Sequence, residues 1–156
     1  MEIRPATPGD SPLLSSLCRD VQTLHARHHP HVFKMPQSDD FAVAFFDEML
    51  ASADMTIYIA EEGSRPVGYI VCRLFDRPEN VFTHASRFLF VDQISVRPGA
   101  QRKGIGAALL KRAEGRAREL GLSKLQLDSW DFNTEAHAFF EKFGFHKFNY
   151  RFWREL

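Results

Sequence analysis

The sequence has few of the features typical of secreted, membrane-bound or nucleic-acid-binding proteins. It has only two cysteines, too few for a disulfide framework. Its 20 Lys and Arg residues balance its 20 Asp and Glu residues, so no basic surface for nucleic acid or an anionic membrane is indicated. No apolar run could span a bilayer, and Met1 to Arg4 shows no signal core. We therefore expect a cytoplasmic protein without a nucleic-acid or membrane partner.

What is present indicates a globular protein. At 156 residues, the chain is long enough for one domain, 1–156, with a real core, and it contains no repeat or linker. Cys18 and Cys72 lie in apolar patterns and are expected to be buried free thiols. The 15 phenylalanines are expected to fill the core or an apolar pocket.

Hydrophobic periodicity predicts the elements in the order β-α-α-β-β-β-α-β-α-β. This order indicates an α+β fold with a mixed central β-sheet flanked by helices. The predicted strands are 1–6, 56–61, 67–74, 87–96, 124–127 and 145–153, and the predicted helices are 11–29, 39–50, 105–120 and 133–143.

A glycine-rich loop joins the fourth predicted strand to the helix that follows it. Gly99 and Gly104 have the spacing of a Walker loop, but Ile105 and Gly106 replace its Lys and its Ser or Thr. A dinucleotide-binding loop is excluded too, because Leu109 stands where its third glycine belongs. What remains is a Gln-x-x-Gly-x-Gly-Ala turn at a helix start, where free N–H groups can hold a phosphate.

This turn, at residues 101–107, resembles the acetyl-CoA loop of the GNAT (GCN5-related) N-acetyltransferase superfamily. Residues 133–145 are similar to the second signature of that superfamily, Asn-x-x-Ala-x-x-Phe-Tyr-x-x-x-Gly-Phe. The two motifs occur in the right order, and the predicted elements extend the resemblance over the chain. The resemblance implies a GNAT-like fold and acetyl-CoA (coenzyme A) as cofactor.

The resemblance also implies which residues form the site. In the family, a bulge in the strand before the loop frees its backbone for pantetheine, and the N–H of Ile94 would face the thioester oxygen. Asn133 would cap a helix, and in the family this residue often also contacts the cofactor arm. The implied cofactor-binding residues are Ile94, Ser95, Val96, Gln101, Arg102, Lys103, Gly104, Gly106, Ala107, Asn133 and Phe140.

Asp92 is the candidate catalytic base, together with Ile94 as the catalytic donor. Asp92 is a carboxylate in an otherwise apolar strand, at a position where many family members have Glu. A buried carboxylate is costly, which favours a role. An ordinary Asp is a weak base for an ammonium group, so we expect it to act through water or to attract the charged amine. The alternative is a carboxylate that pairs with a nearby Arg or His.

The chain departs from the family pattern at Phe140, where the family usually has the tyrosine that protonates the leaving thiolate. Phenylalanine has no proton to donate, and general acids contribute ~10²–10⁴ in rate. The alternatives are Tyr150, His146, a bound water, or the ammonium group formed during attack. Phe140 is still expected to pack against the pantetheine.

Four histidines at positions 25, 28, 29 and 31 form a cluster in sequence. Pro30 interrupts the helix there, and no cysteine completes a metal set, so a polar loop between two helices is favoured over a metal site. In the family this region and the loop at 76–85 cover the acceptor pocket. Asp128 and Ser129 are also expected to face it.

The resemblance implies an acetyl-CoA-dependent N-acetyltransferase that acts on a primary amine of a small molecule or peptide. The alternative is a non-catalytic coenzyme A-binding regulatory or sensor module, which the loss of the tyrosine favours. A weaker reading is a nucleotide-phosphate binder that uses the same loop. No sequence pattern identifies the amine that accepts the acetyl group. Exposed phenylalanines would indicate a homodimer, which is common in the family.

Overall fold

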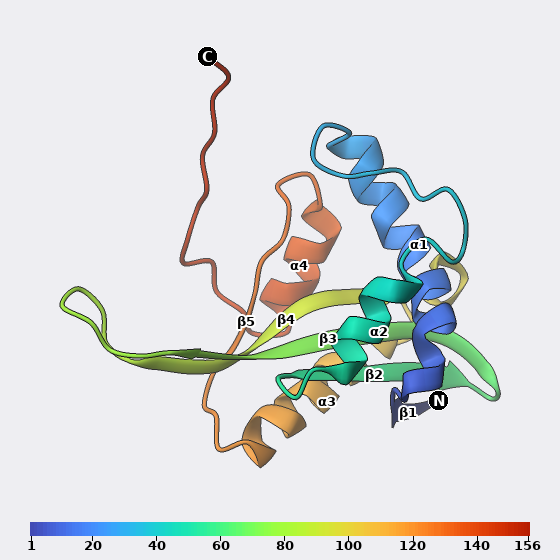
Figure 1. Ribbon diagram of the computed structural model, residues 1–156, viewed down its shortest axis with the longest axis horizontal. Coiled ribbons are helices and arrows are strands. Elements are labelled where there is room, and N and C mark those ends of the chain that lie inside the picture. Colours follow the sequence, from blue (N-terminus) through green and yellow to red (C-terminus); the bar gives the residue numbers. More distant parts are fainter.

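The computed structural model describes residues 1–156 and forms a mixed sheet with helices on both faces (Figure 1). The elements are β1 (Glu2–Pro5), α1 (Ser11–His28), α2 (Val43–Ala51), β2 (Met55–Glu62), β3 (Arg65–Arg77), β4 (Ser86–Val96), α3 (Ile105–Glu119), β5 (Leu125–Leu127) and α4 (Thr134–Lys142). Short 3₁₀ turns, η1 (Pro8–Asp10) and η2 (Pro98–Ala100), precede α1 and α3. None of the helices has the length and apolarity needed to cross a membrane.

The sheet has the strand order β1-β2-β3-β4-β5. The first four strands pair antiparallel in sequence, whereas β5 pairs parallel to β4. Because β5 must run in the same direction as β4, the connection crosses the sheet face through α3. The predicted α+β fold with a mixed sheet is confirmed.

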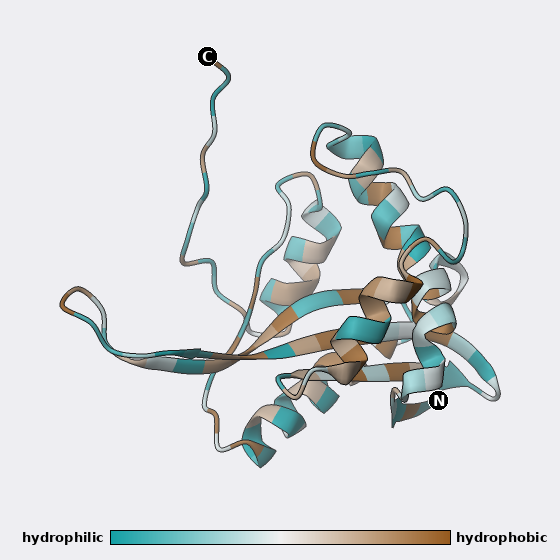
Figure 2. Cartoon of the chain, in the orientation of Figure 1, coloured by the Kyte–Doolittle hydropathy of each residue, from teal (hydrophilic) through white to brown (hydrophobic).

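Two apolar clusters lie on opposite faces of the sheet, and both are built from the alternation of its strands. One contains the buried face of α3, with Leu109, Leu110 and Ala113, together with Phe140 of α4. The other packs Leu14 and Leu17 of α1 and Phe46 of α2 on the opposite face. Figure 2 shows the apolar residues concentrated along the strands, with polar residues on the outer sides of the helices.

A β-bulge in β4 is the local feature that positions the site. In the β3–β4 ladder, Val71 pairs with Gln93 and Cys72 pairs with Val91, so Asp92 is the extra residue. β5 pairs only with Leu89, Phe90 and Val91. The second half of β4 therefore has a hydrogen-bonding neighbour on the β3 side alone.

The predicted strand at 145–153 is absent. After α4, residues 143–156 form no regular element, and the end of the chain extends away from the body of the protein (Figure 1). The alternating side chains give this segment strand character, but a strand also needs a neighbour with free backbone groups. The backbone of residues 146–156 finds none and donates no main-chain hydrogen bond.

Two smaller predictions are also wrong. The second helix begins at Val43 rather than at Asp39, because Ser15 of α1 binds the intervening turn: its hydroxyl donates to Asp39 O and accepts from Ala42 N. The phenylalanines do not all fill the core or a pocket: Phe46, Phe88 and Phe140 are buried, but Phe82, Phe148 and Phe152 are exposed. The buried free thiols Cys18 and Cys72 are as predicted.

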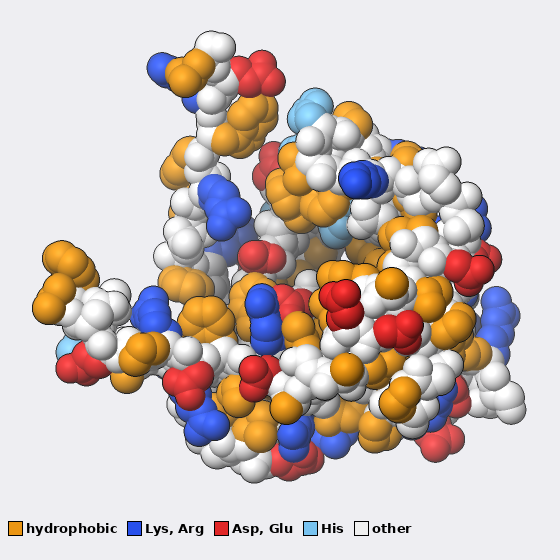
Figure 3. Space-filling view, viewed as in Figure 1, with side chains coloured by type: hydrophobic (Ala, Val, Ile, Leu, Met, Phe, Trp, Pro, Cys, Tyr) orange, Lys and Arg blue, Asp and Glu red, His pale blue; other side chains and the backbone are white.

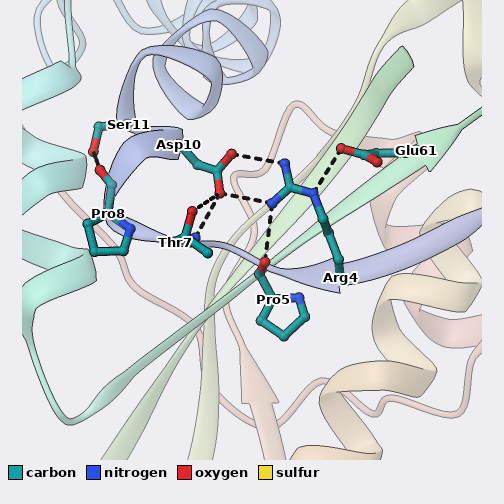
Figure 4. A network of polar contacts seen from close by, with 7 residues as sticks. All are labelled: Arg4, Pro5, Thr7, Pro8, Asp10, Ser11 and Glu61. Atoms are coloured by element: carbon teal, nitrogen blue, oxygen red, sulfur yellow. Dashed lines mark hydrogen bonds and ion pairs between the residues drawn. The ribbon is translucent and has the colours of Figure 1, made fainter. Parts of the chain in front are cut away.

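A cluster of polar contacts around Arg4 fixes the start of the chain (Figure 4). The Arg4 guanidinium donates to both carboxylate oxygens of Asp10, at 2.8 and 2.9 Å, and to Glu61 of β2 at 3.0 Å. The Asp10 carboxylate also accepts from the backbone and hydroxyl of Thr7. Hydrogen bonding to Arg4 lowers the pKa of Asp10 from 3.8 to about 2, against the opposing effect of burial.

We expect Asp10→Asn to lower the free energy of unfolding by ~1–2 kcal/mol at pH 7. A depressed carboxyl pKa contributes stability above pH 3.8, and this contribution is lost as the pH falls through about 2. Denaturant unfolding at a series of pH values checks this. Asp39→Asn, which breaks a far more exposed pair with Arg19, should cost less than ~1 kcal/mol. Equal losses in both variants would contradict the prediction.

Candidate active site

A cleft of about 1670 Å³ opens where β4 and β5 separate. Its walls come from α1, the second half of β4, the start of α3, the end of β5 and α4. Of the cofactor-binding residues predicted from sequence, all except Lys103 line this cleft, as does Asp92. Lys103 instead lies beside Glu62, with its Nζ at 3.6 Å from the Glu62 carboxylate.

The loop between η2 and α3 leaves its amides free. From Arg102 to Ala107, no backbone N–H donates a hydrogen bond to any atom of the protein. Gly104 has a φ of 82°, a left-handed conformation that L side chains rarely adopt, and Arg102 has a φ of 64°. These turns direct consecutive N–H groups outward at the start of α3, where the helix dipole adds positive potential.

The backbone of β4 offers further free groups. The N–H of Arg97 donates to Val67 O of β3, so strand alternation directs the N–H and C=O groups of Ile94 and Val96 toward the opposite, open side. One of these acceptors is already used, because the side chain of Gln101 donates to Val96 O at 3.0 Å. Gln101 thereby ties the loop to the end of β4.

Several charged side chains border the loop end of the cleft. The guanidinium of Arg102 pairs with Glu135 of α4 at 3.2 Å, and both side chains are largely exposed. Lys111 and Lys142 also line the cleft, which the sequence reasoning missed. Lys111 could have been found, because it lies seven residues after Gly104 and therefore on the same helix face. The basic groups suit an anionic ligand at this end.

Close packing holds α4 against the start of α3. A Cβ on Gly106 would lie 3.2 Å from the Phe139 ring, so the absence of a side chain allows this approach. Phe140 is 8% exposed and its ring lies near Phe139 and Phe145. The side chain of Asn133 accepts from Ala136 N at 3.3 Å, so Asn133 caps α4 as predicted.

Asp92 lies at the bulge, with its side chain 17% exposed. Its Oδ1 accepts from Arg73 at 2.8 Å, which is the ion pair considered as the alternative to a catalytic role. Its Oδ2 is buried and has no hydrogen-bond partner. Burial raises the pKa of Asp92 above 3.8 and Asp128 adds to the increase, while Arg73 acts in the opposite direction. One carboxylate oxygen of Asp92 is therefore left without a hydrogen-bond partner in the protein.

The two side chains considered as proton donors in place of the missing tyrosine do not line this cleft. Tyr150 lies in the extended end of the chain and is 69% exposed, and neither it nor His146 lines the cleft. Asp128 and Ser129, predicted to face the pocket, do line it at the end of β5.

The histidine cluster forms an aromatic contact between the end of α1 and the loop before α4. His28 stacks on Phe132 with ring centroids 4.1 Å apart, and His29 Nε2 lies 3.1 Å from the Asp131 carboxylate. His25 stacks on Phe33, and both line the cleft. No group of three or more His, Cys, Asp or Glu side chains is arranged to hold a metal ion.

Sequence comparison finds a match to the acetyltransferase (GNAT) family over residues 19–145. A curated relative, blasticidin-S acetyltransferase of Streptomyces morookaense, is 40% identical over 60 residues. That match covers 38% of this chain and 43% of the relative, so less than half of the relative's length is compared.

Solved structures share the fold over almost the entire chain. The tetramutant of the BH1408 protein from Bacillus halodurans has a TM-score of 0.93 at 19% identity, with both chains fully covered. Aminoglycoside N-acetyltransferase AAC(6')-Iy in complex with CoA has a TM-score of 0.77 at 17% identity, covering 99% of this chain and 93% of that one. At these identities the likeness concerns the fold.

We expect Gly104→Ala to weaken coenzyme A binding at least ~5-fold and to cost ~1–2 kcal/mol of stability, because alanine is strained at a φ of 82°. Titration calorimetry and thermal unfolding measure the two effects. Gly99→Ala is the matched control, because Gly99 lies in η2 just before this loop, without a positive φ and with open space where a Cβ would be. The same affinity for both variants would contradict a role for this turn in binding.

Proposed function

Because the chain belongs to the acetyltransferase (GNAT) family, we propose that it transfers the acetyl group of acetyl-CoA to a primary amine by direct attack of the amine on the thioester. The observation that carries this proposal is the run of unbonded amides from Arg102 to Ala107 at the head of a cleft. The blasticidin-S and aminoglycoside acetyltransferases among the similar proteins favour a small-molecule amine over a peptide.

The residues present fit coenzyme A, the cofactor that GNAT acetyltransferases use. The diphosphate would accept from the N–H groups of Arg102 to Ala107, with Lys111 and Lys142 adding positive charge. The N–H and C=O groups of Ile94 and the N–H group of Val96 would bind the amides of the pantetheine arm, and Phe140 and Asn133 would line its other side. Bound acetyl-CoA supplies an acetyl group that is already activated as a thioester.

Ile94 is the donor that we assign to the thioester oxygen. Its N–H points away from β3 toward the open side of β4, in the separation between β4 and β5. A fixed donor strengthens its hydrogen bond as negative charge develops on that oxygen, and the loss of such a donor costs ~10²–10³ in rate. The bulge at Asp92 sets this orientation.

Asp92 is the group that we assign to the amine. Its Oδ2 has no partner in the protein, and Asp128 adds a second carboxylate nearby, so the site attracts a protonated amine. Burial raises the pKa of Asp92, which brings it closer to the range of a useful base. Arg73 holds the other oxygen and fixes the orientation of the carboxylate.

A second candidate function is a non-catalytic coenzyme A-binding module that serves as a sensor or regulatory subunit. The observation that favours it is Phe140, which puts a buried ring where the family usually has a proton-donating tyrosine. For the catalytic proposal, the neutral amine attacks the thioester and becomes an ammonium group, and the proton that this group then loses, relayed through water, is the remaining source for the leaving thiolate. The two functions differ in whether free thiol is released.

We further propose that the protein forms a homodimer in the cytoplasm. The C-terminal arm, residues 146–156, exposes Phe148, Phe152 and Trp153, each more than 70% accessible. Figure 3 shows apolar side chains along this arm and at the tip of the β3–β4 hairpin. Exposed aromatic residues in a segment with strand alternation suit coverage by a second copy. Two free thiols and the use of acetyl-CoA suit a reducing compartment.

The catalytic proposal is tested by incubating the protein with acetyl-CoA and a panel of small primary amines, with free thiol as the readout. We expect turnover with at least one amine and a fall in kcat of about 100-fold in Asp92→Asn, with coenzyme A affinity unchanged. Asp76→Asn is the matched control, because Asp76 forms an exposed pair with Arg87 on the same two strands. Tight cofactor binding without thiol release from any amine would favour the non-catalytic module.

Asp92→Asn should also change stability in a pH-dependent way. The raised pKa of Asp92 means that ionisation opposes folding, so its stability cost grows as the pH rises above 3.8 and is complete above the folded-state pKa. Relative to the wild type, the free energy of unfolding of the variant should therefore increase from pH 3.8 upward. Denaturant unfolding at pH values from roughly 3.5 to 8 measures the difference, because this range covers both the protonated and the ionised form of Asp92. A constant difference would contradict the raised pKa.

The dimer is tested by light scattering after size-exclusion chromatography. We expect the full chain to be dimeric at micromolar concentration and a variant that ends at Phe145 to be monomeric with an unchanged helix and sheet content, because the core clusters contain no residue of the arm. Val81→Ser with Phe82→Ser at the hairpin tip is a control for general surface hydrophobicity. A monomeric full chain would refute the dimer.

A further inference from the structure

Gln93 follows Asp92 in β4 and lines both the large cleft and a smaller depression of about 480 Å³ beside α2. Its side-chain oxygen Oε1 accepts from the Tyr69 hydroxyl at 2.7 Å and from the Cys18 thiol at 3.7 Å. Its Nε2 donates to no atom of the protein, and it is not among the buried polar atoms that lack a partner. The oxygen of this amide is therefore held by Tyr69 and Cys18, whereas its nitrogen is accessible and has no partner in the protein.

Tyr69 and Cys18 are suited to hold the amide in one orientation. Tyr69 is fully buried in the apolar cluster beneath α1 and α2, with its ring edge against Phe46. Burial raises the pKa of the Tyr69 hydroxyl well above its usual value of 10.0 and also raises the pKa of the Cys18 thiol. Both groups therefore keep their protons at neutral pH and act as donors, so the carbonyl oxygen of Gln93 faces them and the NH₂ group faces out.

The side chain of Gln93 lies on the face of the sheet that α1 and α2 cover. Its two partners, Cys18 and Tyr69, belong to the cluster on the α1 and α2 face, whereas the loop with free amides begins α3 on the opposite face. A ligand that reaches Asp92 from the α1 and α2 side passes Gln93 on the way. The Gln93 NH₂ group is thus a fixed hydrogen-bond donor that lines the same cavities as Asp92, the residue that we assign to the amine.

We propose that Gln93 determines acceptor specificity: it selects primary amines that carry a hydroxyl, ether or carbonyl oxygen on a neighbouring carbon. This inference rests on the proposed function. The protonated amine binds Asp92 Oδ2, and the neighbouring oxygen accepts from Gln93 Nε2. A fixed donor left unpaired beside an apolar ligand loses its bond to water, so the site disfavours an amine that lacks the oxygen. Tyr69 and Cys18 act as positioning residues through Gln93.

The test compares two amines of the same size, trans-2-aminocyclohexanol and cyclohexylamine, as ligands of the protein saturated with coenzyme A. Titration calorimetry gives the affinity ratio, and thiol release from acetyl-CoA gives the ratio of kcat/KM. We expect the wild type to prefer the amino alcohol by ~5- to 10-fold, corresponding to one hydrogen bond. Gln93→Met, which retains length and apolar bulk, should bring the ratio close to one with coenzyme A affinity unchanged.

Tyr69→Phe separates a positioning role from a purely structural one. It should reduce the preference to roughly 2- to 3-fold through KM and leave the kcat for cyclohexylamine unchanged, because the amide loses its orientation but keeps its donor. Tyr58→Phe is the matched control, since Tyr58 is equally buried but lies under Arg112 on the opposite face of the sheet. This control should keep the full preference.

Equal affinities for the two amines in the wild type, or a preference that persists in Gln93→Met, would overturn the inference. Equal preference in Tyr69→Phe and Tyr58→Phe would overturn the positioning role of Tyr69. A calorimetric preference that depends on Gln93 without any thiol release would support the inference about recognition, while the proposed transfer reaction would fail. The two proposals are therefore separable in one set of measurements.

Discussion

The separation of β4 from β5 is the constraint on which the rest of the site depends. A sheet normally satisfies its own backbone groups, but β5 accompanies β4 for only three residues, and the bulge at Asp92 ends that pairing. The groups of Ile94 and Val96 on this side are left without a strand. In the loop after β4, the N–H groups at the start of α3 likewise have no acceptor in the protein. The unpaired backbone groups of β4 and of the loop before α3 line one cleft, where a long ligand with many hydrogen-bonding groups can bind them.

Local sequence signals predicted much of this arrangement because each has a local physical cause. The cap at Asn133, the glycine-rich turn before α3 and the helical spacing of Leu109 and Ala113 depend on residues only a few positions apart. The bulge followed from the family resemblance rather than from periodicity. What local signals could not provide were contacts between distant segments, such as Arg73 with Asp92 or Tyr69 with Gln93.

The errors have the same origin. Residues 145–153 alternate as a strand does, but alternation describes only the side chains, and whether a neighbouring strand lies within reach depends on the fold. The start of α2 was misplaced because Ser15, 24 residues earlier than Asp39, holds the turn before the helix. The roles of Asp92, Ile94 and the loop remain predictions that the contacts make specific, since Asp92 both forms an ion pair and offers a free oxygen.

The contact between Gly106 and the Phe139 ring has a consequence for how such a site can change. Because a Cβ on this second residue of α3 would lie 3.2 Å from the ring, the packing distance between α3 and α4 depends on the absence of a side chain there. A side chain at position 106 would force the Phe139 ring to shift or would move α4 away from α3. Substitutions at positions 106 and 139 are therefore expected to be energetically coupled, since a larger residue at one position requires a smaller residue at the other.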